Sequence, residues 1–199
     1  PEVETTVAGL RSVLEGAVLA RVEPRRADLR FPIPVDLRQR LTGASVIALT
    51  RRAKYGLIAT DRGDMMIFHL GMSGRWRVDP TEIGTHDHLI LETGAGRQLA
   101  LNDPRRFGFI DLVRSEAWEA YGPFTRMGPE PLGPDFDAAH LAAVLKGKAT
   151  SIKAALLDQR IVAGLGNIYV CEALNMAGIA PTRAAGKISR SRLVLLVDS

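Results

Sequence analysis

The first residues of the chain alternate between apolar and polar positions with the period of a helix. Val3, Val7, Leu10 and Leu14 recur at intervals of three to four residues, with acidic residues ahead of them. This spacing is typical of an amphipathic helix, and an acidic first turn favours it further. The pattern predicts one helix that opens the chain.

The next hundred residues change to short apolar runs separated by turn residues. Turn signals at 61–64 and 93–96 join neighbouring runs into hairpins. Many short strands at this spacing favour an antiparallel sandwich or barrel over a parallel sheet. The expected strands are 46–49, 55–59, 65–68, 88–91, 98–101 and 109–113.

The strand pattern stops at residues 126–134, which contain three prolines and two glycines and therefore read as a linker. Helical patterns follow, over 138–145, over 150–157 with Thr150 as N-cap, and from Asn167 as N-cap to about 176. We therefore predict an α+β chain: an antiparallel β-sandwich with an opening helix over 1–125, then an all-α domain over 126–199.

The charge adds little until its distribution is considered. The chain has 26 basic and 22 acidic residues, a net charge of +4. The arginines cluster in residues 51–54, 75–77 and 105–106. Such clusters suit a nucleic-acid-binding surface, while a solvated basic face explains them equally well.

The sequence also argues against several classes of protein. Cys171 is the single cysteine, so neither a disulfide framework nor a cysteine zinc site is expected within these residues. The sequence contains no uninterrupted apolar run of about 18 residues, so no membrane span is predicted. The acidic start of the chain is unlike a signal peptide. We expect a monomeric, cytoplasmic protein.

Two predicted loops carry side chains suited to insertion into a DNA duplex. Arg105, Arg106 and Phe107 follow a proline turn, where arginine can bond base edges and phenylalanine can wedge between stacked bases. Met72, in the glycine-bracketed segment 69–74, is a second candidate wedge. The alternatives are that Phe107 starts a strand and packs in the core, and that Met72 fills the core.

The stretch Gly164-Leu165-Gly166-Asn167 suggests a site for an anion. It lies between two predicted helices, and the start of the second helix would present unpaired N–H groups to a phosphate. A plain helix hairpin with a tight loop is the alternative.

Four further residues are candidates on weaker grounds. Two arginines precede Lys54 and would depress its pKa, which suits proton transfer, although a phosphate contact is the commoner role. His86, two residues from His88 on a strand whose histidines would face the same way, is interpreted as a phosphate or sugar contact and not as a metal ligand. Lys148 and Lys153 flank the start of the 150–157 helix and either reach DNA or are solvated.

Seven segments occur in an order that resembles the formamidopyrimidine-DNA glycosylase family. They are Pro-Glu-Val-Glu-Thr-Thr at 1–6, Arg-Arg-Ala-Lys-Tyr at 51–55, His-Leu-Gly-Met-Ser-Gly at 69–74, His-Asp-His at 86–88, Asp-Pro-Arg-Arg-Phe-Gly at 103–108, Gly-Pro-Glu-Pro-Leu at 128–132 and Gly-Leu-Gly-Asn-Ile-Tyr at 164–169. Each segment is weak alone, whereas the ordered set spans nearly the whole chain.

The resemblance implies a bacterial base-excision repair enzyme that binds damaged double-stranded DNA. Its second domain would be a helix–two-turn–helix module. Members of the family flip out an oxidised purine such as 8-oxoguanine, cleave the glycosidic bond through a Schiff base, and cut the backbone by β,δ-elimination. The alternative is a catalytically inactive DNA-damage binding protein of the same fold. An RNA-associated helical module would leave Met72 and the Arg105–Phe107 run unexplained.

The resemblance also implies roles for individual residues. Lys54 would be the catalytic proton donor, and Met72, Arg105 and Phe107 would fill the space left by the flipped base. The remaining DNA-binding residues would be His69, His86, Lys148 and Lys153, with Asn167 on a phosphate.

Two departures from the family pattern concern the ends of the chain. Family members begin Pro-Glu-Leu-Pro-Glu-Val-Glu, and their first proline is the nucleophile because its secondary amine forms an iminium with the sugar. The continuation at 3–6 aligns Pro1 with the second proline, so Pro1 and Glu2 are not expected to be nucleophile and acid. The family's four-cysteine zinc finger has no counterpart up to Ser199, so zinc is expected only in the full-length protein and this chain alone is expected to be inactive.

Overall fold

The chain divides into two compact units, residues 1–121 and 122–199, each built around its own hydrophobic core. The structure is a computed structural model and describes residues 2–199. The prediction for Pro1 lies outside the described residues. The division falls four residues before the predicted end of the first domain.

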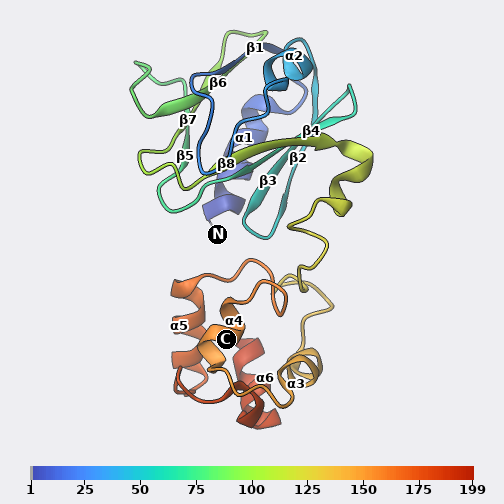
Figure 1. The fold of residues 1–199 in the computed structure, drawn as a ribbon, viewed down its shortest axis with the longest axis vertical. Helices are drawn as coiled ribbons and strands as arrows, with labels where there is room; N and C mark the ends of the chain where they lie inside the picture. The colour runs from blue at the N-terminus through green and yellow to red at the C-terminus, as the bar shows by residue number, and fades with distance from the viewer. Residues whose placement is uncertain (1) are drawn as a thin grey trace. The chain divides into compact units, whose positions relative to one another are not determined.

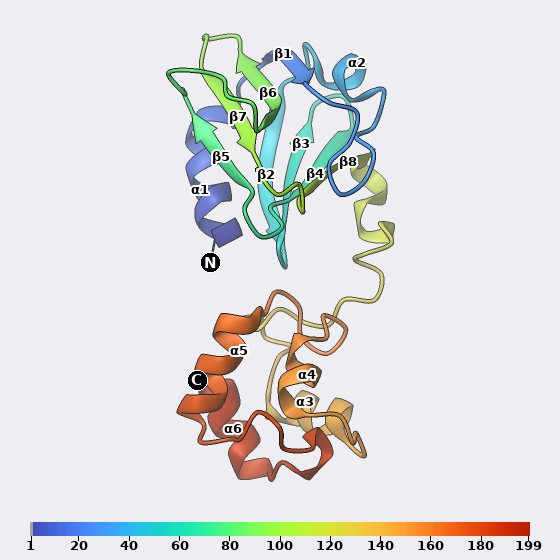
Figure 2. The same ribbon diagram turned by 60° about the vertical axis from the view of Figure 1, so that its left-hand side comes forward.

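Unit 1 is a sandwich of two four-stranded antiparallel sheets, so the predicted α+β class with an antiparallel sandwich is confirmed (Figure 1, Figure 2). One sheet has the order β1-β6-β7-β5 and the other β2-β3-β4-β8. The strands are β1 (Leu19–Pro24), β2 (Val46–Arg52), β3 (Tyr55–Thr60), β4 (Asp64–His69), β5 (Arg75–Val78), β6 (Asp87–Thr93), β7 (Gln98–Asn102) and β8 (Phe109–Arg114). Helices α1 (Glu2–Leu14) and α2 (Leu37–Leu41) and the 3-10 helix η1 (Ser115–Ala120) complete the unit.

Helix α1 buries the face that the periodicity predicts. Val3, Val7, Leu10 and Leu14 all belong to the core of unit 1, and the helix packs against β2 and β3. The guanidinium of Arg11 donates a 2.9 Å hydrogen bond to the carbonyl of Leu49. Burial of an aliphatic face of this size fixes the start of the chain against the second sheet.

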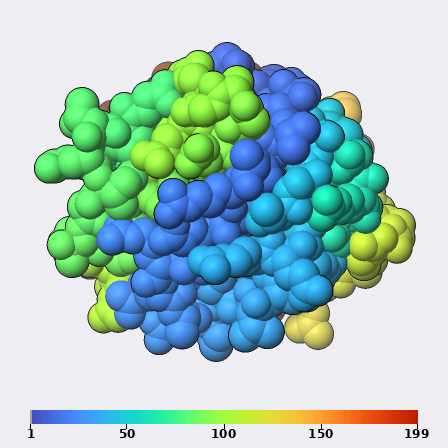
Figure 3. Space-filling view, turned by 90° about the horizontal axis from the view of Figure 1, so that it is seen from above, coloured from blue at the N-terminus to red at the C-terminus, as the bar shows by residue number. Residues whose placement is uncertain are grey.

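The register of the second sheet sets which side chains share an end. Tyr55 pairs with His69, and His69 pairs in turn with Phe109. The opposite end of β3 and β4 carries the turn after Thr60. Figure 3 views the molecule from above, where the blue segments that include the connection from β1 to β2 through α2 spread across the centre of the face.

Unit 2 is helical, with α3 (Ala138–Leu145), α4 (Ile152–Leu157), α5 (Asn167–Met176), the 3-10 helix η2 (Ala185–Lys187) and α6 (Arg190–Asp198). The predicted bounds of α3 are confirmed, but both predicted N-caps are wrong. Ser151, not Thr150, caps α4 by accepting a 3.2 Å bond from the N–H of Ala154. Gly166 is the N-cap of α5, and Asn167 is its first helical residue.

None of the helices formed by residues 2–199 has the length and hydrophobicity needed to span a bilayer.

Candidate functional site

Lys54 lies in the two-residue turn that joins β2 to β3. Arg52 pairs with Tyr55 across this turn, and Ala53 has a φ of 52°, a left-handed conformation in which the chain reverses within two residues. The turn is fixed from the side, because Arg51 donates a 2.7 Å bond to the carboxylate of Glu4 in α1. The amine of Lys54 is therefore carried on a rigid hairpin.

Burial, and not the neighbouring arginines, is the main cause of the lowered pKa of Lys54. The side chain is half-buried, which disfavours its charged form, while the carboxylate of Glu2 partly restores that form. The direction of the predicted shift stands, and its predicted cause is wrong.

A row of aromatic side chains crosses the sheet beside Lys54. Tyr55 and His69 lie 5.0 Å apart between ring centroids, and His69 stacks on Phe109 at 5.5 Å. The Nδ1 of His69 accepts a 3.0 Å bond from the N–H of Gly71. Burial, the charge of Lys54 and that of Arg30 lower the pKa of His69 to about 4, so the ring is neutral near pH 7.

Met72 and Phe107 are exposed, so neither is core filler. Met72 is 74% exposed and Phe107 is 44% exposed. Phe107 is not part of a strand, because β8 begins only at Phe109, which is buried. The guanidinium of Arg105 lies over the ring of Phe107 at 4.6 Å. A flexible apolar tip, an aromatic ring and a cation are thus presented to solvent on two loops.

The strand pattern predicted that His86 and His88 face the same way, but in the structure they do not share a surface. His86 precedes β6 and is exposed, whereas His88 is buried and its Nε2 lies 2.9 Å from the carbonyl of Asp103. A register shift between Asp87 and Leu89 accounts for the difference. His86 remains available for a phosphate contact, and His88 is structural.

Several clustered arginines are structural as well. Arg77 contacts the fully buried carboxylate of Asp87 at 2.8 Å, and Asn102 donates to the other oxygen of Asp87. Arg75 and Arg77 lie on β5, a strand that the sequence analysis did not predict. Arg77 therefore has a structural role that neither reading of this cluster predicted, while Arg75 is exposed.

In unit 2, Asn167 occupies the first turn of α5 and is exposed. The first intrahelical bond runs from the N–H of Val170 to the carbonyl of Gly166. The N–H groups of residues 167–169 thus precede that bond and point from the positive end of a ten-residue helix. This geometry suits a phosphate.

The loop before α5 is organised by Gln159, which the sequence analysis missed. Its side-chain oxygen accepts a 2.7 Å bond from the N–H of Gly164, and its amide donates to the carbonyl of Leu165. Gly164 has a φ of 87°, which only glycine adopts without strain. A polar residue within a glycine-rich turn is the signal that identifies such a role.

The two predicted lysines of unit 2 differ in exposure. Lys148 is exposed, and after the stronger effect of Arg160 it helps to lower the pKa of Asp158. Lys153 is half-buried on the first turn of α4, and its backbone N–H donates to the carbonyl of Pro181.

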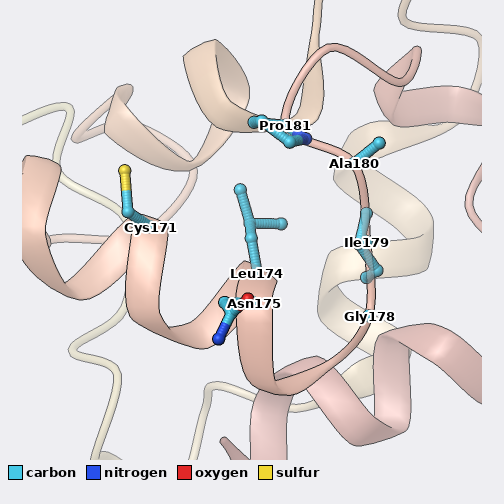
Figure 4. Close-up of a pocket in the computed structure, with 7 residues that line it drawn as sticks. All are labelled: Cys171, Leu174, Asn175, Gly178, Ile179, Ala180 and Pro181. Carbon is cyan, nitrogen blue, oxygen red and sulfur yellow. The ribbon is translucent and has the colours of Figure 1, made fainter.

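A hollow of about 390 Å³ lies on unit 2 beside α5. Cys171, Leu174, Asn175 and residues 178–181 line it (Figure 4). None of the predicted site residues contributes to it. The candidate site is therefore made of exposed loops and not of this hollow.

Residues 2–199 contain no group of three histidine, cysteine, aspartate or glutamate side chains that could hold a metal. These residues do not fit a zinc ion.

Two family models match nearly the whole chain. The formamidopyrimidine-DNA glycosylase N-terminal domain matches residues 1–110, and the formamidopyrimidine-DNA glycosylase H2TH domain matches residues 127–199. Among similar proteins, the formamidopyrimidine-DNA glycosylases of Rhizorhabdus wittichii and Novosphingobium aromaticivorans are 70% and 62% identical over 199 residues, which is all of this chain and 74% of each relative.

Solved structures agree with this assignment. A crystal structure of Lactococcus lactis formamidopyrimidine-DNA glycosylase, non-covalently bound to DNA with an AP site, superposes with a TM-score of 0.92 at 33% identity. It covers 100% of this chain and 75% of the Lactococcus chain. A complex of the Lactococcus enzyme with DNA containing an abasic site matches with a TM-score of 0.92 at 32% identity.

Proposed function

Because the chain belongs to the formamidopyrimidine-DNA glycosylase family, we propose that the full-length protein excises oxidised purines from double-stranded DNA. Its substrates would be 8-oxoguanine and ring-opened formamidopyrimidines. After excision it would cut the backbone at the resulting site by β,δ-elimination.

The observation that carries the proposal is the exposure of Met72, Arg105 and Phe107 on adjoining loops. Apolar side chains that are exposed together on adjoining loops mark a candidate interaction surface. An enzyme that acts on a base must extrude it from the duplex and fill the space that it leaves. An apolar tip, a ring and a guanidinium match that space and the edge of the unpaired opposite base.

The chemistry assigned to this chain is proton transfer by Lys54. An amine whose pKa is lowered by burial gives up its proton more readily near neutral pH. The hairpin that carries Lys54 is tied to α1 through the bond between Arg51 and Glu4. The nucleophile would be a secondary amine that forms an iminium with the sugar, and residues 2–199 are not assigned that role.

Binding would be supplied by phosphate contacts from both units. His86 in unit 1 and Lys148, Lys153 and Asn167 in unit 2 carry exposed or half-exposed groups suited to phosphate oxygens. His69 contributes from within the aromatic row. Zinc, which the family resemblance implies for the full-length protein, would require ligands other than residues 2–199, and we propose that the protein acts as a monomer.

Borohydride trapping tests the proposal. The full-length protein, incubated with a duplex containing 8-oxoguanine and then reduced, should form a covalent complex that denaturing gels resolve. The 199-residue chain should form none, and its trapping would make Pro1 the nucleophile.

The rival function is a catalytically inactive protein that binds damaged DNA. It predicts tight binding of the lesion duplex with neither base release nor trapping by the full-length protein. That combination of results would replace the proposed activity.

A further inference from the structure

Two loops of unit 1 approach each other so closely that their backbones touch. We call residues 70–74 the Met72 loop and residues 103–108 the Arg105 loop. A Cβ atom added to Gly71 would lie 2.4 Å from the carbonyl carbon of Phe107, and one added to Gly108 would lie 2.5 Å from the carbonyl oxygen of His69. Only glycine fits at either position, so the contact is a built part of the fold.

A buried carboxylate joins the same two loops. Asp103 is 1% exposed. Its Oδ1 accepts a 2.6 Å bond from the hydroxyl of Ser73 in the Met72 loop, and its Oδ2 accepts a 2.8 Å bond from the N–H of Gly108. The Oγ of Ser73 accepts in turn from the N–H of Arg105 at 3.3 Å.

The backbone of Asp103 extends the connection to the histidines. Its N–H donates to the carbonyl of His86 at 3.0 Å, and its carbonyl lies 2.9 Å from the Nε2 of His88 and accepts from the N–H of Arg106 at 3.2 Å. Arg106 has a φ of 56°, a left-handed conformation that costs an arginine free energy. This conformation closes the turn and sends Phe107 to the surface while Phe109 enters the core.

We infer that Asp103 and Ser73 form a clasp that makes Met72, Arg105 and Phe107 one rigid insertion element. Asp103 and Ser73 are positioning residues, because they act through the three side chains and not on the DNA. The inference rests on the proposed function and adds that both wedges must enter the duplex together.

Coupling between the two wedges follows from this arrangement. If the loops move as one body, removing either side chain disables most of the insertion, and removing the second adds little. Residues that act as a unit are non-additive in double-mutant cycles, whereas independent residues are additive.

The test measures the rate of insertion into a duplex in which 2-aminopurine lies beside 8-oxoguanine. The fluorescence of 2-aminopurine rises when the neighbouring base is unstacked. The full-length protein, Met72→Ala, Phe107→Ala and the double variant form one cycle, and the same four proteins with Ser73→Ala form a second. We expect coupling of about fivefold or more in the insertion rate in the first cycle and less than about twofold in the second.

Thr60→Ala is the matched control for a lost buried hydroxyl bond. The Oγ1 of Thr60 donates a 2.9 Å bond to the carbonyl of Asp64 at the other end of the sheet. A cycle in the Thr60→Ala background should keep the wild-type coupling. Equal coupling with and without the Ser73 hydroxyl would overturn the clasp, and so would equal loss of coupling in the Thr60→Ala cycle.

Asp103 variants add a test that does not depend on Ser73. Asp103→Asn can accept from Gly108 and donate to Ser73, so it should retain the coupling that Asp103→Ala loses; loss in both would refute the positioning role. A wild-type protein that leaves the lesion duplex closed would refute the proposed function and the clasp together, whereas an altered result confined to the cycles concerns the clasp alone.

Discussion

At the scale of single residues, Lys54 owes its chemistry to its surroundings. The β2–β3 turn holds its amine half-buried, and this burial lowers its pKa while Glu2 acts in the opposite direction. A proton donor is active while it is protonated, so activity should fall as the pH rises through this lowered pKa.

Lysine and glutamate variants of the full-length protein check that assignment on DNA with an abasic site. Lys54→Ala should slow β-elimination by about 100-fold or more. Glu2→Gln removes an attraction that raises the pKa of Lys54, so the decline at high pH should move to lower pH. Glu15→Gln, just after the far end of α1 and paired with Arg11, is the matched control and should leave the decline in place. A decline that ignores Glu2→Gln would contradict the electrostatic account.

His69 makes a second residue-scale prediction, about stability. Its pKa is lowered to about 4 in the folded protein, whereas an unfolded histidine takes up a proton near pH 6.5. Unfolding therefore binds a proton between these two values, and stability decreases as the pH falls through that window. At pH 4.5 the protonation of His69 on unfolding lowers the free energy of unfolding by about 2 kcal/mol.

His69→Gln should remove this part of the pH dependence, because glutamine can accept the bond from Gly71 without titrating. Urea unfolding at pH 7 and pH 4.5 measures the effect. Wild type should lose about 2 kcal/mol more than the variant between the two pH values, and parallel losses would refute the shift.

At the scale of elements, the strands with clear apolar runs could be predicted, including the edge strands β2 and β8, whereas the edge strands β1 and β5 of the other sheet could not. β1 and β5 form the two edges of their sheet. β5 has no buried residue, so its Arg-Trp-Arg-Val sequence resembles a basic surface cluster more than a strand. Apolar periodicity in a sequence reflects the burial of alternate residues, so an edge strand with little burial has a weak periodic pattern.

The exposed wedges illustrate a different limit of the sequence. Phe107 and Phe109 are two residues apart and would share a face in an extended strand. The positive φ of Arg106 and the Asp103 turn separate them, so one is exposed and the other buried. The turn bonds of Asp103 are local, but its bond from Ser73 comes from 30 residues away, and the local pattern of apolar and polar residues does not predict that bond.

The loop before α5 carries the element-scale prediction. Gln159→Leu removes the bonds to Gly164 and Leu165 and should loosen the helix start that Asn167 occupies. Binding to lesion and undamaged duplexes should weaken by about the same factor, on the order of tenfold. Gln39→Leu, an exposed glutamine in α2, is the matched control. A loss confined to the lesion duplex would contradict a phosphate role.

At the scale of the whole molecule, binding would combine phosphate contacts from two units with separate cores. Each neutralised phosphate releases counterions, so affinity falls with salt in proportion to the number of contacts. The exposed Lys148 lies in unit 2 and carries one such proposed contact.

Lys148→Ala should reduce the slope of log affinity against log salt concentration by about 0.9. Fluorescence anisotropy across a salt series measures the slope. Lys146→Ala removes another exposed charge two residues away and should change the slope less. Equal effects from both variants would mean that general charge, and not a contact, sets the slope.

The edge strands affect how copies of this protein associate at high concentration. β5 has four residues and carries Arg75 and Arg77, and β2 on the other sheet ends in Arg51 and Arg52. Short, charged edges resist pairing with the exposed edge of a second molecule. The arginines of β5, which obscure that strand in the sequence, and those at the end of β2 are therefore expected to disfavour edge-to-edge pairing of folded molecules.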